Sequence, residues 1–211
     1  MLRSLRSVLA KPEAYQFWWN LVGGSAWAEE LVTKYIHPDS TARILDIGCG
    51  PGTLLHYLPQ SGYLGFDLSP EYIALARKRF PEAHFVCERV SKFSLAEQHG
   101  FDVVLAIGIV HHLDDAEAVQ LFQVAFDALK PGGKLITVDG VYTDRQSKVA
   151  RWLLSRDRGE YVRKEQDYIR LASQVFGAVV PSVRHDLLRI PYTHLILNCT
   201  RPVASSQAIA I

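Results

Sequence analysis

The sequence has little net charge, few cysteines and no long apolar run, and each of these three features excludes a class of protein. The formal net charge is +1, so no overall field draws the chain to nucleic acid or to an anionic membrane. The three cysteines are scattered and form no CxxC pair, which predicts neither a disulfide framework nor a metal site. No apolar stretch approaches the roughly 18 residues that span a bilayer. These features predict a cytoplasmic protein without stable membrane insertion.

The length and composition suit one globular domain. The chain has 211 residues, of which 48% are hydrophobic and 21% charged, and it is long enough to bury a sizeable core. No internal repeat or low-complexity segment interrupts it. The N-terminal stretch MLRSLRSVLAKP contains arginine and serine but no acid. That composition is shared by transit peptides and by short amphipathic turns, and we favour the second interpretation.

Between residues 43 and 139 short apolar runs alternate with helical stretches. Helices are expected from near Thr53, over SPEYIALARKRF with Ser69 as N-cap, and over DDAEAVQLFQVAFDALKPGG, where Asp114 and Glu117 form a cap-like pair. Strands separated by helices in this way predict a parallel sheet that is covered on both faces. The five expected strands are RILDI, YLGFDLS, HFVCERV, FDVVLAIGIV and KLITVDG.

Two further apolar runs follow a polar, helical stretch at roughly 145 to 175. They read VVPSVRHDLL and YTHLILNCT, and only the connection RIP lies between them. A parallel pair needs a crossover connection of a dozen or more residues, for which there is no room. We therefore expect these two strands to be antiparallel neighbours.

The stretch ILDIGCGPGTLL places glycines at alternate positions after the first expected strand, at Gly48, Gly50 and Gly52. Glycines at this point let the backbone approach a ligand at the carboxyl ends of the strands. A dinucleotide fits poorly, because Thr53 occupies the place of the fingerprint's third glycine and a pyrophosphate would face the carboxylate of Asp46. S-adenosylmethionine fits better, since it carries an ammonium and a sulfonium and no phosphate.

These motifs resemble those of the class I S-adenosylmethionine-dependent methyltransferases over residues 43–139. ILDIGCGPG resembles the family's first motif, GFDLS the second, FDVVLAIGIVHHL the fourth, and LKPGGKLITVDG the segment leading into strand five. The resemblance implies a Rossmann-like, doubly wound α/β sheet of seven strands, mostly parallel with the last strand antiparallel, and helices on both faces. It also implies a methyltransferase with S-adenosyl-L-methionine as its cofactor.

The resemblance assigns the cofactor-binding residues as well. Asp67 is expected on the ribose and Leu68 beside the adenine. After strand three the family commonly has an aspartate that holds the adenine amino group, and here Arg89 stands in that place. Glu88, Arg89 and Val90 are the candidates for that contact, with adenine held by backbone alone as the alternative. The residues expected along the methionine half are Asp46, Gly48, Cys49, Gly50 and Gly52, and Ile107 and Gly108 are further expected cofactor-binding residues.

His111 and His112 follow the fourth strand, beside the expected methyl group, and are candidate catalytic residues. A base is needed only where the acceptor must lose a proton. The positive end of the following helix favours a neutral imidazole, the form that a base requires. We expect His111, the nearer to the strand, to face the acceptor and His112 to act mainly on stability. The alternative is that these histidines support the helix or stack on the cofactor.

The acceptor is expected to be a small molecule. Enzymes that methylate exocyclic base amines resemble one another in an Asn/Asp-Pro-Pro-aromatic motif after strand four, where this chain reads GIVHHL, so we expect no nucleic-acid substrate. Basic residues are in excess between 145 and 170, which suits an anionic acceptor or else marks a solvated helix face. The expected reaction is O- or N-methylation of an anionic or an aromatic, hydrophobic metabolite. The candidate acceptor-binding residues are Tyr15, Trp19, Tyr142, Arg145 and His185.

We expect a single domain over residues 1–211 with four parts. They are a helical lid (1–40) hinged at Gly23 and Gly24, a cofactor-binding core (41–140), variable acceptor-side helices (141–178) and the last strand pair (179–201). The N-terminal part has two alternatives, a helix packed on the sheet and a lipid contact. The rival functions are a non-catalytic S-adenosylmethionine-binding protein and, less favoured, a nicotinamide-dependent oxidoreductase. The sequence predicts no oligomeric state.

Overall fold

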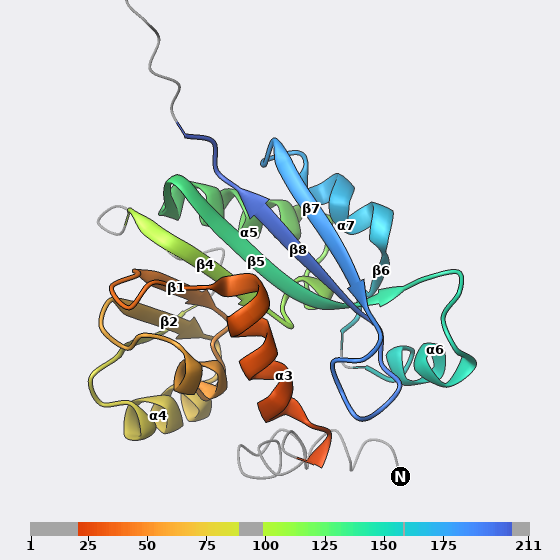
Figure 1. Cartoon of the computed structure of the whole chain (residues 1–211), viewed down its shortest axis with the longest axis horizontal. Coiled ribbons are helices and arrows are strands. Elements are labelled where there is room, and N and C mark those ends of the chain that lie inside the picture. Colours follow the sequence, from red (N-terminus) through yellow and green to blue (C-terminus); the bar gives the residue numbers. More distant parts are fainter. Residues whose placement is uncertain (1–20, 89–98, 158, 204–211) are drawn as a thin grey trace, which may run out of the picture.

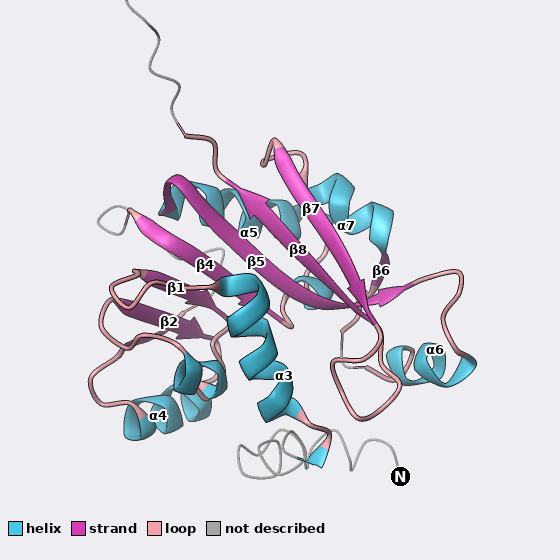
Figure 2. Cartoon of the chain, in the orientation of Figure 1, coloured by secondary structure: helices cyan, strands magenta, loops and turns pink. Residues whose placement is uncertain are grey.

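The computed structural model describes residues 21–88, 99–157 and 159–203, and a single mixed sheet runs through the molecule (Figures 1 and 2). Its strand order is β3-β2-β1-β4-β5-β8-β7, with the short β6 pairing to β5 off this path. The strands are β1 (Ile44–Ile47), β2 (Tyr63–Asp67), β3 (His84–Cys87), β4 (Phe101–Ile107), β5 (Leu129–Tyr142), β6 (Arg163–Lys164), β7 (Ala178–Arg184) and β8 (His194–Thr200).

The first five strands are parallel, and β8 runs antiparallel between β5 and β7. This confirms the doubly wound sheet and the antiparallel last pair, with the two-residue β6 as an addition. The chain winds in one direction from β1 through β2 to β3 and in the other from β4 to β5. A topological switch point therefore lies between β1 and β4, where open α/β sheets bind their ligands.

The helices begin where the sequence provides caps. Ser69 accepts a hydrogen bond from the Tyr72 amide, and Asp114 and Glu117 form a complete capping box, both as expected. The helix expected from Thr53 is shorter, a 3-10 turn, because Pro59 favours an extended Leu58. The helical elements are α3 (Gly24–Leu31), the π-helix η1 (Val32–Ile36), the 3-10 helices η2 (Thr53–Tyr57) and η4 (Val110–His112), α4 (Pro70–Arg79), α5 (Asp115–Ala128), α6 (Lys148–Leu154) and α7 (Glu165–Ala172).

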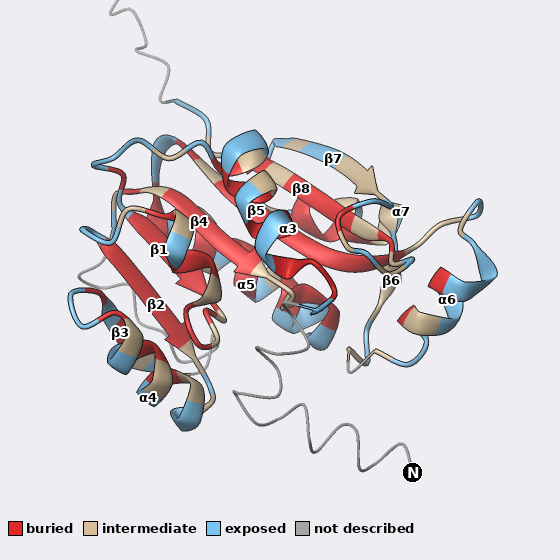
Figure 3. Ribbon diagram, turned by 60° about the horizontal axis from the view of Figure 1, so that its bottom comes forward, coloured by how far each residue is buried: buried red, intermediate tan, exposed pale blue. Residues whose placement is uncertain are grey.

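Each face of the sheet packs its own hydrophobic core (Figure 3). Successive residues of β4 show the alternation, since Leu105 belongs to the cluster with α3 and α4 whereas Val104 belongs to the cluster with α5 and α7. On the first face α3 buries Trp27 and Leu31, so residues 24–36 form a packed helical segment. Within the described ranges no helix is long and apolar enough to cross a membrane.

Candidate active site

The glycine stretch forms a tight loop between β1 and the switch point. The amides of Gly48 and Cys49 both donate to the Phe66 carbonyl, at 2.8 and 3.0 Å. Gly48, Gly50 and Gly52 have φ angles of 73°, 54° and 72°, a region that favours glycine. A Cβ on Gly48 would lie 2.2 Å from Cδ1 of Ile109, so the loop packs directly against the segment after β4.

Asp67, at the end of β2, holds this loop in place. One carboxylate oxygen accepts from the Gly50 amide at 2.9 Å, and the other accepts from the Ser69 amide at 2.9 Å. An ionised carboxylate has about four acceptor sites, so each oxygen can accept one further hydrogen bond. Asp67 can therefore organise the loop and still receive the ribose hydroxyls of an adenosine.

Asp46 is a buried acid at the mouth of the loop. Its residue surface is 3% exposed, and the Tyr63 hydroxyl donates to its Oδ2 at 2.7 Å. Burial raises the pKa of Asp46 to about 7, against the Tyr63 hydrogen bond and together with the charge of Asp67. A cationic ligand beside this carboxyl would favour its charged form.

Two adjoining cavities make one groove across the carboxyl ends of β1, β2 and β4. Their volumes are about 280 and 210 Å³, and they share Gly48, Asp67, Ile109 and His112. The larger one is also lined by Trp27, Ala28, Asp46, Cys49, Gly50, Pro51, Thr53, Leu54, Tyr72, Ile107 and Gly108. The smaller one is also lined by Phe66, Leu68, Glu88, Leu113, Glu117 and Gln120.

The described lining of the groove contains acidic residues but no lysine or arginine. Asp46 and Asp67 line the part with the glycine loop, and Glu88 and Glu117 line the other. Among the described residues that line it there is no lysine or arginine. A pyrophosphate would find carboxylates where it needs basic groups, whereas a ligand with an ammonium, a sulfonium and an uncharged adenosine is complementary.

Of the two histidines, only His112 lines the groove. Both lie on η4, where successive side chains diverge by about 120° because a 3-10 turn has about three residues. Their rings contact each other, with centroids 4.3 Å apart. His112 lines both cavities, whereas His111 is not among the described lining of either.

His111 is buried in an acidic cluster. Its Nδ1 lies 2.8 Å from Oδ1 of Asp139, and its Nε2 lies 3.6 Å from Oδ1 of Asp157. The Tyr192 hydroxyl donates to the other oxygen of Asp157. Burial lowers the pKa of His111, but hydrogen bonds and charges of Asp139 and Asp157 outweigh it and raise the pKa to about 9. This direction is opposite to the expected neutral imidazole, because the carboxylates of Asp139 and Asp157 outweigh the helix dipole.

The segment around Asp157 clamps the η4 turn. The Tyr161 amide donates to the His111 carbonyl at 2.9 Å, and a Cβ on Gly159 would lie 2.0 Å from the His111 ring. Arg163 donates to the carbonyls of Val110 and Leu113. Through Asp139 on β5 and through Asp157 and Tyr161, His111 thus connects η4 to β5 and to the segment after α6.

Some of the other predicted site residues line the groove, some lie elsewhere in the structure, and some fall outside the described residues. Cys49, Gly50, Ile107 and Gly108 line the larger cavity, and Leu68 and Glu88 line the smaller one. Gly52 closes the loop against Phe80. Tyr142, under the Arg151 guanidinium, Arg145 and His185 are absent from the described linings of both cavities. Tyr15, Trp19, Arg89 and Val90 lie outside the described residues.

Several lining residues were not predicted as site residues. Trp27 comes from α3, Tyr72 from α4 and Gln120 from α5, so three elements far apart in sequence close on the glycine loop. Gln120 lies three residues after Glu117 on the exposed first turns of α5. That spacing puts both on one helix face and was the available signal. Trp27 lies in the N-terminal segment (1–40) that was expected to form a lid.

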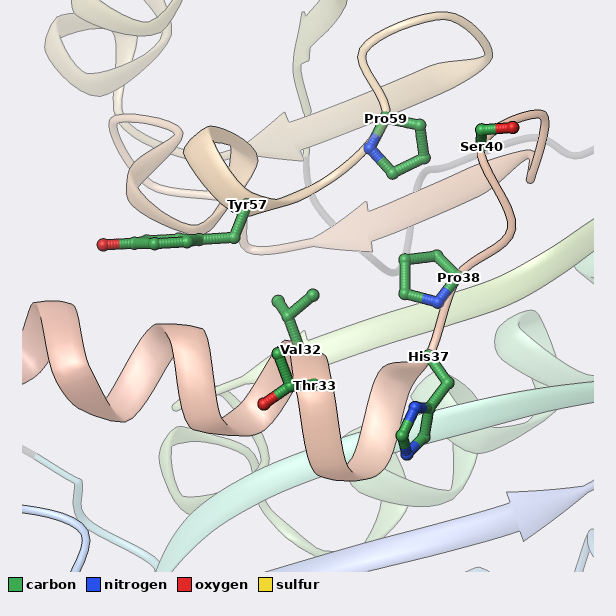
Figure 4. Close-up of a pocket in the computed structure, with 7 residues that line it drawn as sticks. All are labelled: Val32, Thr33, His37, Pro38, Ser40, Tyr57 and Pro59. Atoms are coloured by element: carbon green, nitrogen blue, oxygen red, sulfur yellow. The ribbon is translucent and has the colours of Figure 1, made fainter.

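A separate, open depression of about 560 Å³ lies near the amino ends of β1 and β2 (Figure 4). Its position, at the opposite end of these strands from the glycine loop, sets it apart from the groove. It is lined by Val32, Thr33, His37, Pro38, Ser40, Tyr57 and Pro59.

Comparison with known proteins agrees with this geometry. Residues 44–133 match the family model described as a methyltransferase domain. Trans-aconitate 2-methyltransferase of Variovorax paradoxus is 34% identical over 112 residues, which cover 51% of this chain and 42% of that enzyme. The chain spans about half the length of the curated relatives that it matches.

Solved structures share the fold over nearly the whole chain. A TehB-like S-adenosylmethionine-dependent methyltransferase of Corynebacterium glutamicum has a TM-score of 0.62 at 21% identity, covering 90% of this chain and 97% of that one. The N-methyltransferase NodS of Bradyrhizobium japonicum, in complex with S-adenosylhomocysteine, has a TM-score of 0.68 at 16% identity, covering 95% and 98%. The chain therefore shares its fold with these methyltransferases, and residues 44–133 match the methyltransferase-domain model.

Replacing Asp67 with alanine is expected to weaken S-adenosylmethionine binding by about 2–4 kcal/mol, because two hydrogen bonds to a charged acceptor are lost. Calorimetric titration measures this directly. Asp67→Asn, which keeps one acceptor oxygen, should lose less. Asp39→Ala, an exposed acid at the amino end of β1, is the control and should bind normally. Wild-type affinity in Asp67→Ala would contradict the ribose assignment.

Proposed function

We propose that the protein transfers the methyl group of S-adenosylmethionine to a small-molecule acceptor. The observation that carries this proposal is the acid-lined groove at the switch point, which closes on a glycine loop and has no lysine or arginine among its described lining. The methyltransferase-domain match over residues 44–133 supports it.

The groove residues have distinct roles in this proposal. Bound S-adenosylmethionine supplies a methyl group already activated on a sulfonium, so the protein mainly has to hold the reactants in line and exclude water. Asp67 orients the ribose, and Asp46 provides negative charge to the methionine half. Trp27 and Ala28 close the larger cavity from the α3 side.

His112 is the better candidate for a group that touches the acceptor, since it lines the groove and His111 does not. Where the acceptor is a hydroxyl or an ammonium, His112 would accept its proton. His111 would hold η4, and with it His112, at the correct place. A carboxylate acceptor would need no base.

The acceptor proposed is an anionic or an aromatic, hydrophobic metabolite, methylated on oxygen or nitrogen. The relative named for trans-aconitate supports an anionic acceptor. Tyr142, the last residue of β5, and Arg145, just after it, are candidates for its recognition, as is His185. Cys49, Cys87 and Cys199 are free thiols, which supports the cytoplasmic location inferred from the sequence.

The test is a transfer assay with a methyl-labelled cofactor. The protein is incubated with labelled S-adenosylmethionine and a panel of carboxylates, phenols and amines, and S-adenosylhomocysteine and the labelled product are detected by mass spectrometry. Product formation that Asp67→Ala loses is the expected result. Tight cofactor binding without turnover on any acceptor would favour a non-catalytic binding protein, and preferential binding of a nicotinamide dinucleotide would overturn the proposal.

The buried Asp46 predicts a pH dependence of cofactor binding. In the free protein its pKa is about 7, and a cationic ligand lowers that pKa, so binding releases a proton near neutrality. Affinity should therefore rise as the pH increases toward 7 and level off above it, by up to about tenfold per pH unit on the acid side. Titrations in buffers of different ionisation enthalpy measure the released proton.

Asp46→Asn is the matched comparison, because it has the same shape and does not titrate. On binding S-adenosylmethionine, this variant should release fewer protons from the protein, and its affinity should depend less on pH. Equal proton release in both proteins would show that Asp46 is already ionised before the cofactor binds.

A further inference from the structure

The helix α6 presents an unusual surface beyond the carboxyl end of β5, at the end of the sheet that also carries the groove (Figure 1). Ser147 caps the helix by accepting from the Ala150 amide at 3.1 Å, and Ala150 and Leu154 are buried against the body of the protein. On the opposite side Val149 and Trp152 are each 56% exposed. A tryptophan left this far in water is uncommon, because so large an apolar side chain is usually well covered.

The same segment concentrates positive charge. Between residues 144 and 156 the exposed basic residues are Arg145, Lys148, Arg151 and Arg156, and the only acid is Asp144. The whole chain has a net charge of only +1, so this segment departs strongly from the rest. Asp157, just after it, is held by His111 and Tyr192.

These basic side chains lack the partners that arginines elsewhere have. Arg163, Arg170 and Arg184 form ion pairs with carboxylates. None of the four basic residues of the segment pairs with a carboxylate in the described part of the chain. Two of them lie over aromatic rings instead, Arg156 at 5.5 Å from the Trp152 ring centre and Arg151 at 5.2 Å from that of Tyr142.

An exposed tryptophan and valine surrounded by unpaired cations fit one environment well. At the surface of an anionic bilayer a tryptophan ring lies at the level of the headgroups, aliphatic side chains enter the acyl boundary, and lysine and arginine contact phosphates. A single-stranded nucleic acid would need a longer basic groove with several stacking rings, which one short helix does not provide.

We propose that this surface, made of Arg145, Lys148, Val149, Arg151, Trp152 and Arg156, docks the protein on anionic membranes. Docking is peripheral, through one short helix, and is reversible. It is independent of methyl transfer, so it stands or falls separately from the proposed function.

Co-sedimentation of the full-length protein with lipid vesicles tests the proposal. We expect binding to phosphatidylcholine vesicles that contain about one third phosphatidylglycerol, weak binding to pure phosphatidylcholine, and release at high salt, since surface electrostatics are screened there. The double variant Lys148→Glu with Arg151→Glu should bind at least about tenfold more weakly, because each basic residue near the membrane contributes severalfold. Trp152→Ser should also bind more weakly while keeping its salt dependence.

The matched control places the same charge change on another helix. Arg77→Glu with Lys78→Glu, on exposed positions of α4, alters the net charge equally and should bind vesicles within about twofold of wild type. Thermal unfolding verifies that every variant is folded. Equal loss of binding in both double variants would overturn the proposal, as would equal binding to neutral vesicles, absence of vesicle binding, or capture of a single-stranded RNA in place of vesicles.

Discussion

Replacing Gly50 with valine is expected to reduce S-adenosylmethionine affinity by more than about 100-fold. Gly50 has a φ of 54°, which costs a β-branched residue about 1–3 kcal/mol of strain. Apart from its chain neighbours, a Cβ on Gly50 would meet no atom of the described residues within 4 Å, and Gly50 lines the larger cavity, so the added side chain would occupy ligand space. The Gly50 amide also donates to Asp67, so any shift of this residue disturbs the ribose contact.

Gly62→Val is the control for backbone strain. Gly62 has a φ of 82°, and a Cβ there would meet its nearest neighbour at 3.5 Å, an ordinary contact. Gly62 lies just before β2, at the amino end of the sheet and away from the groove. This variant should lose some stability and keep its cofactor affinity. If Gly50→Val bound as well as Gly62→Val, the glycine loop would not be the cofactor site.

His111→Gln is expected to lower the free energy of unfolding by about 3 kcal/mol near pH 6. The substitution removes the cation between two carboxylates whose side chains are 1% and 25% exposed, Asp139 and Asp157. Removing one partner of a buried ion pair typically costs 3–5 kcal/mol, because the remaining charge is uncompensated. Urea unfolding measures the loss.

The contribution of His111 to the unfolding free energy should depend on pH. The pKa of His111 is raised from 6.5 to about 9 in the folded protein, so its contribution is fully present below pH 6.5 and is lost as the pH rises through 9. Burial raises the pKa of Asp157, but the hydrogen bonds from His111 and Tyr192 and the charge of His111 outweigh it and lower that pKa, so the contribution of Asp157 is present above its usual pKa and is lost only in acid. The wild-type unfolding free energy should therefore fall between pH 6.5 and 9.

The variant His111→Gln should show a flat profile over that range. His185→Gln is the control, since His185 is exposed and bonds only to Thr193. It should follow the wild-type profile closely. A wild-type profile without a slope above pH 6.5 would mean that His111 is neutral in the folded protein, as the sequence alone had suggested.

The fold could be predicted from the sequence because its signals are local. Apolar runs bounded by glycines and caps mark β1 to β5. The connection between β7 and β8 runs over residues 185–193, longer than the expected RIP, and is still too short for a crossover. The helix at Thr53 was overestimated because the effect of Pro59 on Leu58 was not weighed. The glycine loop with Asp46 and Asp67 was placed correctly in the groove, since strand-end residues of a parallel sheet meet at one edge.

The roles of His111 and His112 could not be read in the same way. Their orientation depends on the phase of a single 3-10 turn, and the charge of His111 depends on Asp157, which lies on a segment 46 residues further along the chain. Neither relation leaves a pattern in a window of sequence. Trp27 was expected only as part of the N-terminal lid, because its contact with the groove depends on the tertiary packing of α3 beside the glycine loop.

The most direct test of the cofactor assignment is an equilibrium titration of the wild-type protein with S-adenosylmethionine and, separately, with NAD⁺. The acid-lined groove predicts one S-adenosylmethionine bound per chain, with NAD⁺ at least about 100-fold weaker because its pyrophosphate would face Asp46 and Asp67. Binding of NAD⁺ with comparable or higher affinity, or no binding of S-adenosylmethionine, would contradict it.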